Sequence, residues 1–74
     1  MISFAPLLKI LSQNGKTKTW LKNNGILVGG TYTAVMAATK EPVKEGISIS
    51  AVNRLCKALN CQPGDILEYI PDEE

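Results

Sequence analysis

The sequence predicts a small, mainly α-helical protein, and three observations lead to this prediction. The 74 residues are 45% hydrophobic, which is ordinary for a globular chain and argues against disorder. Residues 48–59 place apolar side chains at helical spacing behind Ser48, a good N-cap residue. Two shorter segments, residues 6–13 and 17–24, stop at Asn-Gly pairs, as helices often do. We therefore expect short helices joined by tight turns.

The segment with the clearest helical signals is residues 48–71. Its expected apolar stripe consists of Ile49, Val52, Leu55, Cys56 and Leu59. Asn60 tolerates positive φ and is expected to end this helix, and Pro63 suits the first position of a second short helix. Asp65 then lies in a first turn, where the helix dipole favours an anion. Cys56 is expected to be a buried structural thiol and Cys61 a free one.

The two ends of the chain are expected to meet. Residues 2–4 are too few for a helix, and their best partner for a short antiparallel pairing is the apolar piece at residues 68–70. Pro6 then suits the start of a helix whose apolar face is expected to consist of Leu7, Leu8, Ile10 and Leu11. Thr17 is the expected N-cap of the next helix, in which Leu21 is the clearest core residue.

Residues 26–41 allow two interpretations. In the first, residues 26–30 form a turn and a helix begins near Thr31. That helix would direct Tyr32, Val35 and Met36 inward and place Thr31, Thr33, Ala34 and Ala38 outward or at the rim. In the second, residues 26–28 and 31–35 are strands joined by Gly29-Gly30. The alanines and the helical flanks favour the helix, the β-branched residues favour the hairpin, and both interpretations stay open.

The residue inventory gives no support for catalysis or for a bound cofactor. Histidine, the commonest general base and metal ligand, is absent. Cys56 and Cys61 alone cannot complete a zinc site, which normally needs four ligands. Gly29-Gly30 is not followed by the Gly-Lys-Thr of a phosphate loop. We therefore expect neither an enzyme nor a metal or cofactor site.

Charge is distributed unevenly along the chain. Residues 1–44 carry six lysines and one acid, a net charge of +5, whereas residues 45–74 carry two basic and six acidic residues, a net charge of −4. Lys16, Lys18 and Lys22 cluster around Thr17 and Thr19, a group of donors that suits phosphate oxygens. No apolar run is long enough to span a membrane and the N-terminus does not resemble a signal peptide, so we expect a cytoplasmic protein.

A family resemblance is carried by NRLCKALNCQPGDILEYIPDEE (residues 53–74), MISFAPLLKIL (residues 1–11) and TKTWLKNNGI (residues 17–26). In these segments the chain resembles the small phage-repressor-like regulators of the lambda repressor and Cro helix-turn-helix superfamily. The resemblance implies one compact all-α, five-helix DNA-binding domain over residues 1–74, of bacterial or phage-like type. It makes residues 17–24 the second helix, Gly25-Ile26 the turn, and the helix from about Thr31 the recognition helix.

The chain departs from this family pattern in the region expected to read bases. Residues 27–30 are longer than the family turn, and no Arg, Asn or Gln lies between Ile26 and Lys40. The loop before Ser48 is also longer than usual for the family. These departures bear on base recognition more than on the fold.

The leading hypothesis is a DNA-binding transcriptional regulator that acts without a cofactor, with double-stranded DNA as its partner and two protomers on a near-palindromic site. The expected DNA-binding residues are Lys16, Thr17, Lys18, Lys22, Gly30, Thr31, Thr33, Ala34 and Lys40. Lysines are expected to hold phosphates, and the threonines at 31 and 33 to approach the bases. The alternative hypothesis is a protein-interaction or dimerisation module that keeps the fold but has lost sequence-specific DNA reading.

Overall fold

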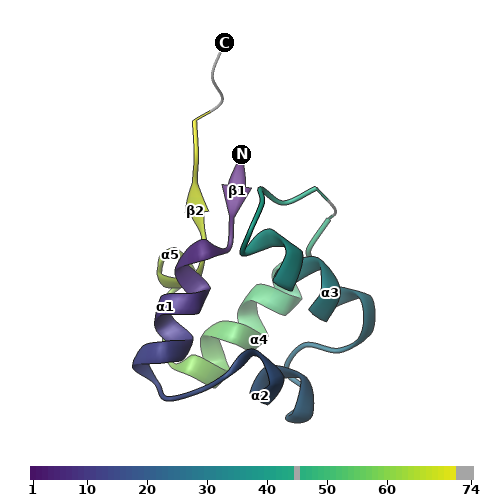
Figure 1. The fold of residues 1–74 in the computed structure, drawn as a ribbon, viewed down its shortest axis with the longest axis vertical. Helices are drawn as coiled ribbons and strands as arrows, with labels where there is room; N and C mark the ends of the chain where they lie inside the picture. The colour runs from purple at the N-terminus through teal and green to yellow at the C-terminus, as the bar shows by residue number, and fades with distance from the viewer. Residues whose placement is uncertain (45, 72–74) are drawn as a thin grey trace.

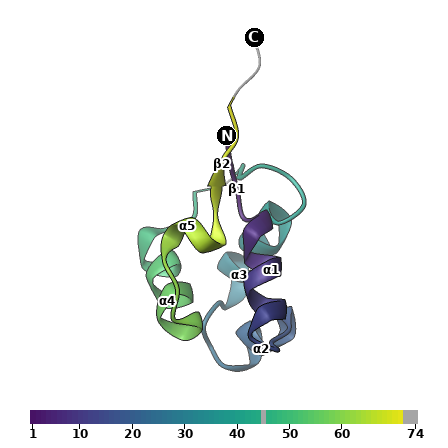
Figure 2. The same cartoon turned by 90° about the vertical axis from the view of Figure 1, so that its left-hand side faces the viewer.

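A computed structural model describes residues 1–44 and 46–71 of the chain. Within these residues the elements follow in the order β1 (Ile2–Ser3), α1 (Ala5–Gln13), α2 (Lys18–Asn23), α3 (Gly29–Ala38), α4 (Ile49–Leu59), α5 (Pro63–Ile66) and β2 (Glu68–Tyr69). Figure 1 shows α1 and α5 beside each other, with α2 and α3 following around α4. Turned by 90°, α4 and α5 lie on one side and α1, α2 and α3 on the other (Figure 2). The mainly helical, five-helix prediction is confirmed.

The apolar core lies between these two groups and draws on every helix. Its buried members are Phe4, Leu7, Leu11, Leu21, Leu27, Val35, Ala38, Ala51, Val52, Leu55, Leu59 and Ile66. Ten of these twelve are larger than alanine, and burial of such apolar side chains is the main stabilising contribution to folding. No helix of residues 1–44 and 46–71 is long and apolar enough to cross a membrane.

The predicted pairing of the chain ends is confirmed. β1 and β2 are antiparallel, with Ile2 opposite Tyr69 and Ser3 opposite Glu68. The N-terminal ammonium of Met1 donates to the Ile70 carbonyl at 2.7 Å, which extends the pairing by one residue. Both strands rise from the same end of the helical body (Figure 1). This ribbon ties the start of α1 to the residue that follows α5.

The caps of α4 and the first-turn residues of α5 are those that the sequence predicts. The Ser48 hydroxyl accepts from the Ala51 N–H at 3.1 Å, and Asn60 takes the left-handed conformation with φ of 51°. Pro63 opens α5, and the Asp65 carboxylate accepts from the Gln62 N–H at 3.0 Å. The acidic residues 72–74 lie outside the described residues.

The predicted apolar stripe of α4 needs one correction. Ile49 is 82% exposed, and Ala51 is buried in its place. The centre of the buried face lies between Val52 and Leu55, so Ile49, about 110° away around the helix, falls outside it. Cys56 lies at the margin of the same face and is half-buried rather than buried. Leu8 of α1, at 36% exposed, is likewise at the edge of its predicted face.

Residues 29–38 form a helix, so the hairpin interpretation is wrong. The helix begins at Gly29, two residues before the expected Thr31, and Gly29 takes a positive φ of 55°, which glycine adopts without strain. Val35 is buried and Tyr32 and Met36 pack partly buried against the core, as predicted.

Ala38 was expected outward or at the rim, and that expectation is wrong because Ala38 is buried. Its carbonyl accepts from the Phe4 N–H at 2.9 Å, and the Ser3 hydroxyl lies 3.5 Å away. The end of α3 is therefore covered by the segment that joins β1 to α1. This contact joins residues 34 or more positions apart and has no signal in the local sequence pattern.

Candidate nucleic-acid interface

The first part of the candidate site is α2, whose start is fixed by Thr17. Its side-chain oxygen accepts from the Trp20 N–H at 3.2 Å, and its extended backbone is that of an N-cap, as predicted. Leu21 is buried and Trp20 is half-buried against the core, so one side of the short helix packs on the body of the protein. Its polar side chains are left on the outside of the molecule.

The lysines around α2 do not form one compact cluster. Lys18 and Lys22 are four positions apart and share a face of the helix. The Lys16 ammonium lies 4.8 Å from the centre of the Trp20 ring. Trp20 is about 160° around the axis of α2 from Lys18. The Lys22 ammonium lies 5.7 Å from the centre of the Tyr32 ring on α3. The structure thus brings Lys18 and Lys22 together and directs Lys22 toward α3, while Lys16 lies on the Trp20 side.

The turn between α2 and α3 is built from backbone hydrogen bonds and one arginine. The N–H groups of Ile26 and Leu27 both donate to the Leu21 carbonyl, at 3.0 and 3.3 Å, and Leu27 is fully buried. Gly25 takes a positive φ of 68°, which lets the chain reverse direction after α2. The insertion of Leu27 into the core fixes where α3 begins.

Arg54 of α4 stabilises this turn through a hydrogen bond to its backbone. Its Nε donates to the Ile26 carbonyl at 3.1 Å, and a terminal guanidinium nitrogen donates to the Ser50 hydroxyl at 3.5 Å. The sequence analysis gave no role to Arg54 or to the buried Leu27. The four-residue spacing of Ser50 and Arg54 is visible in the sequence, whereas the bond to Ile26 spans 28 residues and depends on tertiary packing.

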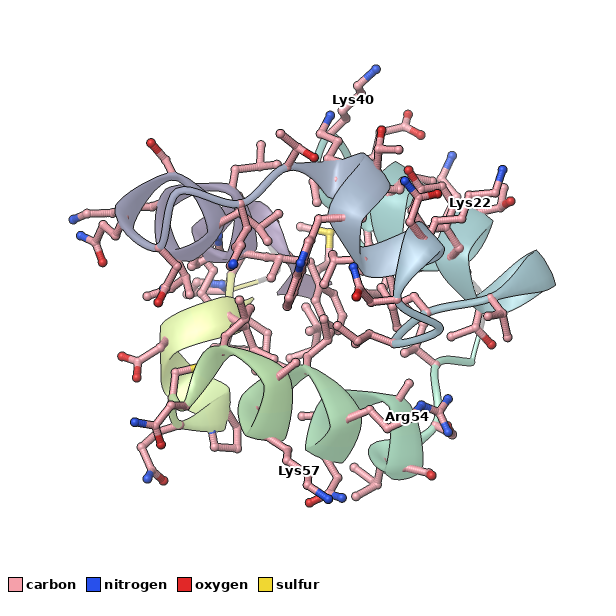
Figure 3. All side chains as sticks on the ribbon, turned by 90° about the horizontal axis from the view of Figure 1, so that it is seen from below. Lys22, Lys40, Arg54 and Lys57 are labelled. Atoms are coloured by element: carbon pink, nitrogen blue, oxygen red, sulfur yellow. The ribbon has the colours of Figure 1, made fainter. Side chains whose placement is uncertain are left out.

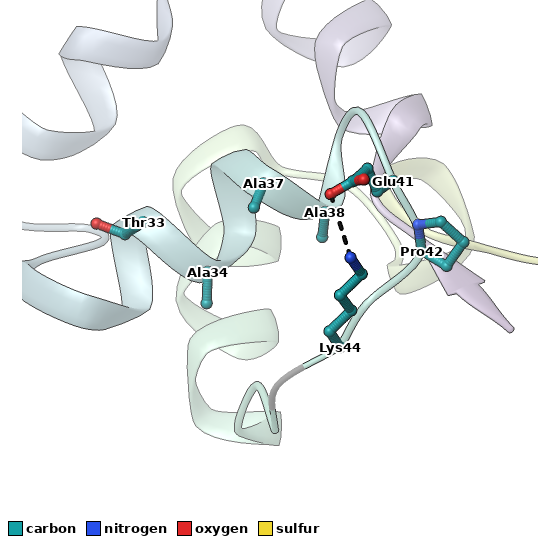
Figure 4. A pocket seen from close by; sticks show the side chains of 7 residues that line it. All are labelled: Thr33, Ala34, Ala37, Ala38, Glu41, Pro42 and Lys44. Carbon is teal, nitrogen blue, oxygen red and sulfur yellow. Dashed lines mark ion pairs between the residues drawn. The ribbon is translucent and has the colours of Figure 1, made fainter.

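The exposed face of α3 carries only small side chains. Gly29, Gly30, Thr33 and Ala37 are exposed, and Thr31 and Ala34 are half-buried. A shallow groove, here called the α3 groove, runs along this face beside the following loop. It is lined by Thr33, Ala34, Ala37, Ala38, Glu41, Pro42 and Lys44 (Figure 4). Of the expected DNA-binding residues on α3, the structure brings Gly30, Thr33 and Ala34 to this exposed side, and Thr31, one of the two expected base contacts, is half-buried.

The remaining cations are spread around the body. In the view from below, Lys40 and Lys22 project from one side and Lys57 from the opposite side, with Arg54 at the edge between them (Figure 3). Lys40 is exposed and lies two residues beyond the end of α3. Lys44 forms an ion pair with Glu41, with 3.6 Å between Nζ and Oε2, at the rim of the α3 groove. Lys22 and Lys40 therefore project from the same side of the molecule, Lys22 near the start of α3 and Lys40 just beyond its end.

The two thiols lie apart from this surface, at the junction of α4 and α5. The Cys61 N–H donates to the Cys56 carbonyl at 3.0 Å. Burial raises the pKa of the Cys61 thiol, and the neighbouring Cys56 and Asp65 raise this pKa further. A raised pKa keeps the thiol protonated, so Cys61 is a poor nucleophile near neutral pH.

The short helix α2, a tight turn and the helix α3 with its exposed face follow one another along the chain. This is the arrangement of a helix-turn-helix DNA-binding domain. The comparisons with known proteins agree. Residues 6–72 match the family model of the Cro/C1-type HTH DNA-binding domain, and the chain belongs to this family.

One relative extends this result. The chain is 44% identical over 45 residues to a Bacillus subtilis (strain 168) protein described as an uncharacterized HTH-type transcriptional regulator, YozG. The match covers 61% of this chain and 54% of the relative, so the chain spans about half the length of the relative. No solved structure matches the chain. The predicted kinship with small Cro- and repressor-like regulators is confirmed.

Proposed function

We propose that this protein is a transcriptional regulator that places α3 in the major groove of duplex DNA while α2 crosses the phosphate backbone. Family membership supports the DNA-binding class, and the similarity to an HTH-type regulator supports a role in transcription. The observation that carries the proposal is the α2–turn–α3 unit, whose turn is fixed by the Leu21 carbonyl and by Arg54. In such a unit the second helix enters the groove. The chain works as one helix-turn-helix unit, without a catalytic step.

The proposed contacts follow from the geometry. Lys22, beside Tyr32 near the start of α3, and Lys40, two residues beyond its end, contact phosphates along the groove, and Lys18 joins Lys22 on α2. Lys16 contacts the backbone from the Trp20 side, and Thr17 acts by fixing the start of α2. Gly30, Thr31, Thr33 and Ala34 lie on the first turns of α3 and approach the base edges. We place this activity in a bacterial cytoplasm, where the chromosome is accessible.

A salt titration tests the proposal. A duplex is selected from a random pool, and the affinity of the wild type and of Lys22→Gln is measured from low to moderate salt. Neutralising one phosphate-contacting lysine lowers the slope of log affinity against log salt by about one. Lys9→Gln is the matched control, because Lys9 lies on α1 beside Gly64 and Asp65, away from α3. Absence of binding to any duplex at low salt contradicts the proposal.

We further propose that two copies bind together on a near-palindromic site, since paired half-sites one helical turn apart are the usual targets of such domains. Two strongly exposed apolar side chains, Ile49 at 82% and Val28 at 56%, offer surface for a protein contact. Light scattering of the protein alone and with DNA checks the stoichiometry; one protomer per selected duplex contradicts pairing.

The same two exposed side chains favour a second candidate function, a protein-interaction module that no longer reads sequence. In that case the protein forms a stable complex with another protein and binds duplexes equally well whatever their sequence. Val28→Ser and Ile49→Ser then abolish the protein complex, whereas a regulator that reads DNA keeps the sequence of its selected half-site in both variants.

A further inference from the structure

The exposed face of α3 lacks the side chains that usually read bases by paired hydrogen bonds. Its exposed residues, Gly29, Gly30, Thr33 and Ala37, carry at most one hydroxyl. Arg, Asn and Gln, which bind guanine or adenine in a bidentate manner, are absent between Ile26 and Lys40. The helix that the proposed function places in the major groove must therefore discriminate between bases mainly through its apolar groups.

Thr33 is the largest exposed side chain of this face, and its hydroxyl is already engaged. The hydroxyl donates to the Gly29 carbonyl one turn earlier in the helix, at 3.5 Å. Threonine in a helix commonly makes this bond to its own backbone. In the view of Figure 4, the hydroxyl oxygen points away from the other labelled residues that line the groove. The γ-methyl group of Thr33 is thus the part left for contact with another molecule.

The centre of the α3 groove is apolar, like the γ-methyl group of Thr33. Ala34 and Ala37 present methyl groups along its floor, and the Pro42 ring forms part of the far wall (Figure 4). Among the described residues of the lining, Glu41 is the one carboxylate; it lies 3.6 Å from the Lys44 ammonium, and this ion pair offsets its charge. The lining therefore offers C–H groups at its centre and balanced charge at its rim. The thymine C5-methyl is the apolar group that the major groove of DNA displays.

We infer that Thr33 is a specificity-determining residue that selects thymine through contact between its γ-methyl and the thymine C5-methyl, which enters the α3 groove. The inference rests on the proposed DNA-binding function and names the base that the site prefers. It predicts that the selected duplex contains one or two thymines whose methyl groups, rather than their hydrogen-bonding edges, are required.

The test replaces each thymine of the selected duplex in turn by deoxyuridine, which removes only the methyl group. For the wild type, the affinity falls about three- to fivefold at the contacted position, the loss that one buried methyl group gives. Thr33→Val keeps the methyl and deletes the hydroxyl, and it retains this ratio of thymine to uracil affinity. Thr33→Ser keeps the hydroxyl and deletes the methyl, and its ratio falls to about one.

Two controls separate this effect from a general loss of structure. Thr39→Ser, the same exchange at a buried position where serine can keep the hydroxyl bond to the Met36 carbonyl, leaves the ratio unchanged. Circular dichroism checks that each variant is folded. Uracil tolerated at every position, or a ratio lost in Thr33→Val but kept in Thr33→Ser, overturns the inference while the proposed function stands. Failure to retain any duplex overturns the proposed function itself, and the inference with it.

Discussion

α3 and α4 are similar in length, at 10 and 11 residues, but they are held in opposite ways. α4 has a side-chain cap at Ser48, a left-handed stop at Asn60 and one continuous buried face. α3 has no side-chain cap, begins with two glycines, and buries only Val35 and Ala38. α4 is therefore stabilised largely by signals in its own sequence, whereas α3 is held by its neighbours. Because α3 buries so little of its surface in the core, one of its faces stays available for contact with another molecule.

Truncation of the core has the largest effect and probes this difference directly. Leu55 and Val35 are both fully buried, one on each helix. Leu55→Ala is expected to lower the free energy of unfolding by about 2–5 kcal/mol. Val35→Ala is expected to cost about 1–3 kcal/mol, because fewer carbons are removed from a less extensively buried helix. Urea unfolding followed by circular dichroism gives both values, and a larger loss for Val35→Ala breaks the comparison.

Exchanges at the two N-caps have an intermediate effect and opposite signs. Ser48→Ala removes the bond to the Ala51 N–H and is expected to cost about 1 kcal/mol. Val28→Ser supplies a capping hydroxyl at an extended, 56% exposed position and is expected to add about 0.5–1 kcal/mol. Ser12→Ala, an exposed exchange inside α1, serves as the control and changes the free energy of unfolding little. A destabilised Val28→Ser shows that α3 needs the Val28 side chain itself.

The smallest effect is expected at Arg54, the link between the two helices. Arg54→Gln removes the charge and the bond from Nε to the Ile26 carbonyl, and it is expected to cost about 0.5–1 kcal/mol because the contact is exposed. DNA affinity falls with an unchanged salt slope, since the guanidinium fixes the turn rather than a phosphate. A slope lower by about one contradicts this role and makes Arg54 a phosphate contact.

The sequence predicted best those features whose causes lie within a few residues. The cap at Thr17 and the stop at Asn60 depend on a side chain or backbone preference that is readable locally. Ile49 was misplaced because helical spacing defines a stripe but not the centre of the face that packs. Ala38 was misplaced because the segment that covers it, around Phe4, comes from the N-terminal end of the chain.

In the candidate site, too, local features could be predicted from the sequence and long-range contacts could not. The lysines and threonines near α2 are visible in the sequence, but their spacing alone does not show that Lys16 lies over Trp20 while Lys22 points toward α3. The choice between a hairpin and a helix for residues 29–38 was open because glycine, threonine and alanine carry weak and conflicting preferences. Packing of Val35 and insertion of Leu27 into the core give α3 the contacts that its propensities lack.

Taken alone, the chain's residues determined the caps, the short helices, the meeting of its two ends and its membership of a helix-turn-helix class. Each of these depends on local backbone chemistry or on apolar spacing. Only the tertiary structure decided where α3 begins, which of its faces is free and how the Arg54 guanidinium reaches the Ile26 carbonyl. These features arise from contacts between residues far apart in the chain, whose free energy exists only once the core has formed.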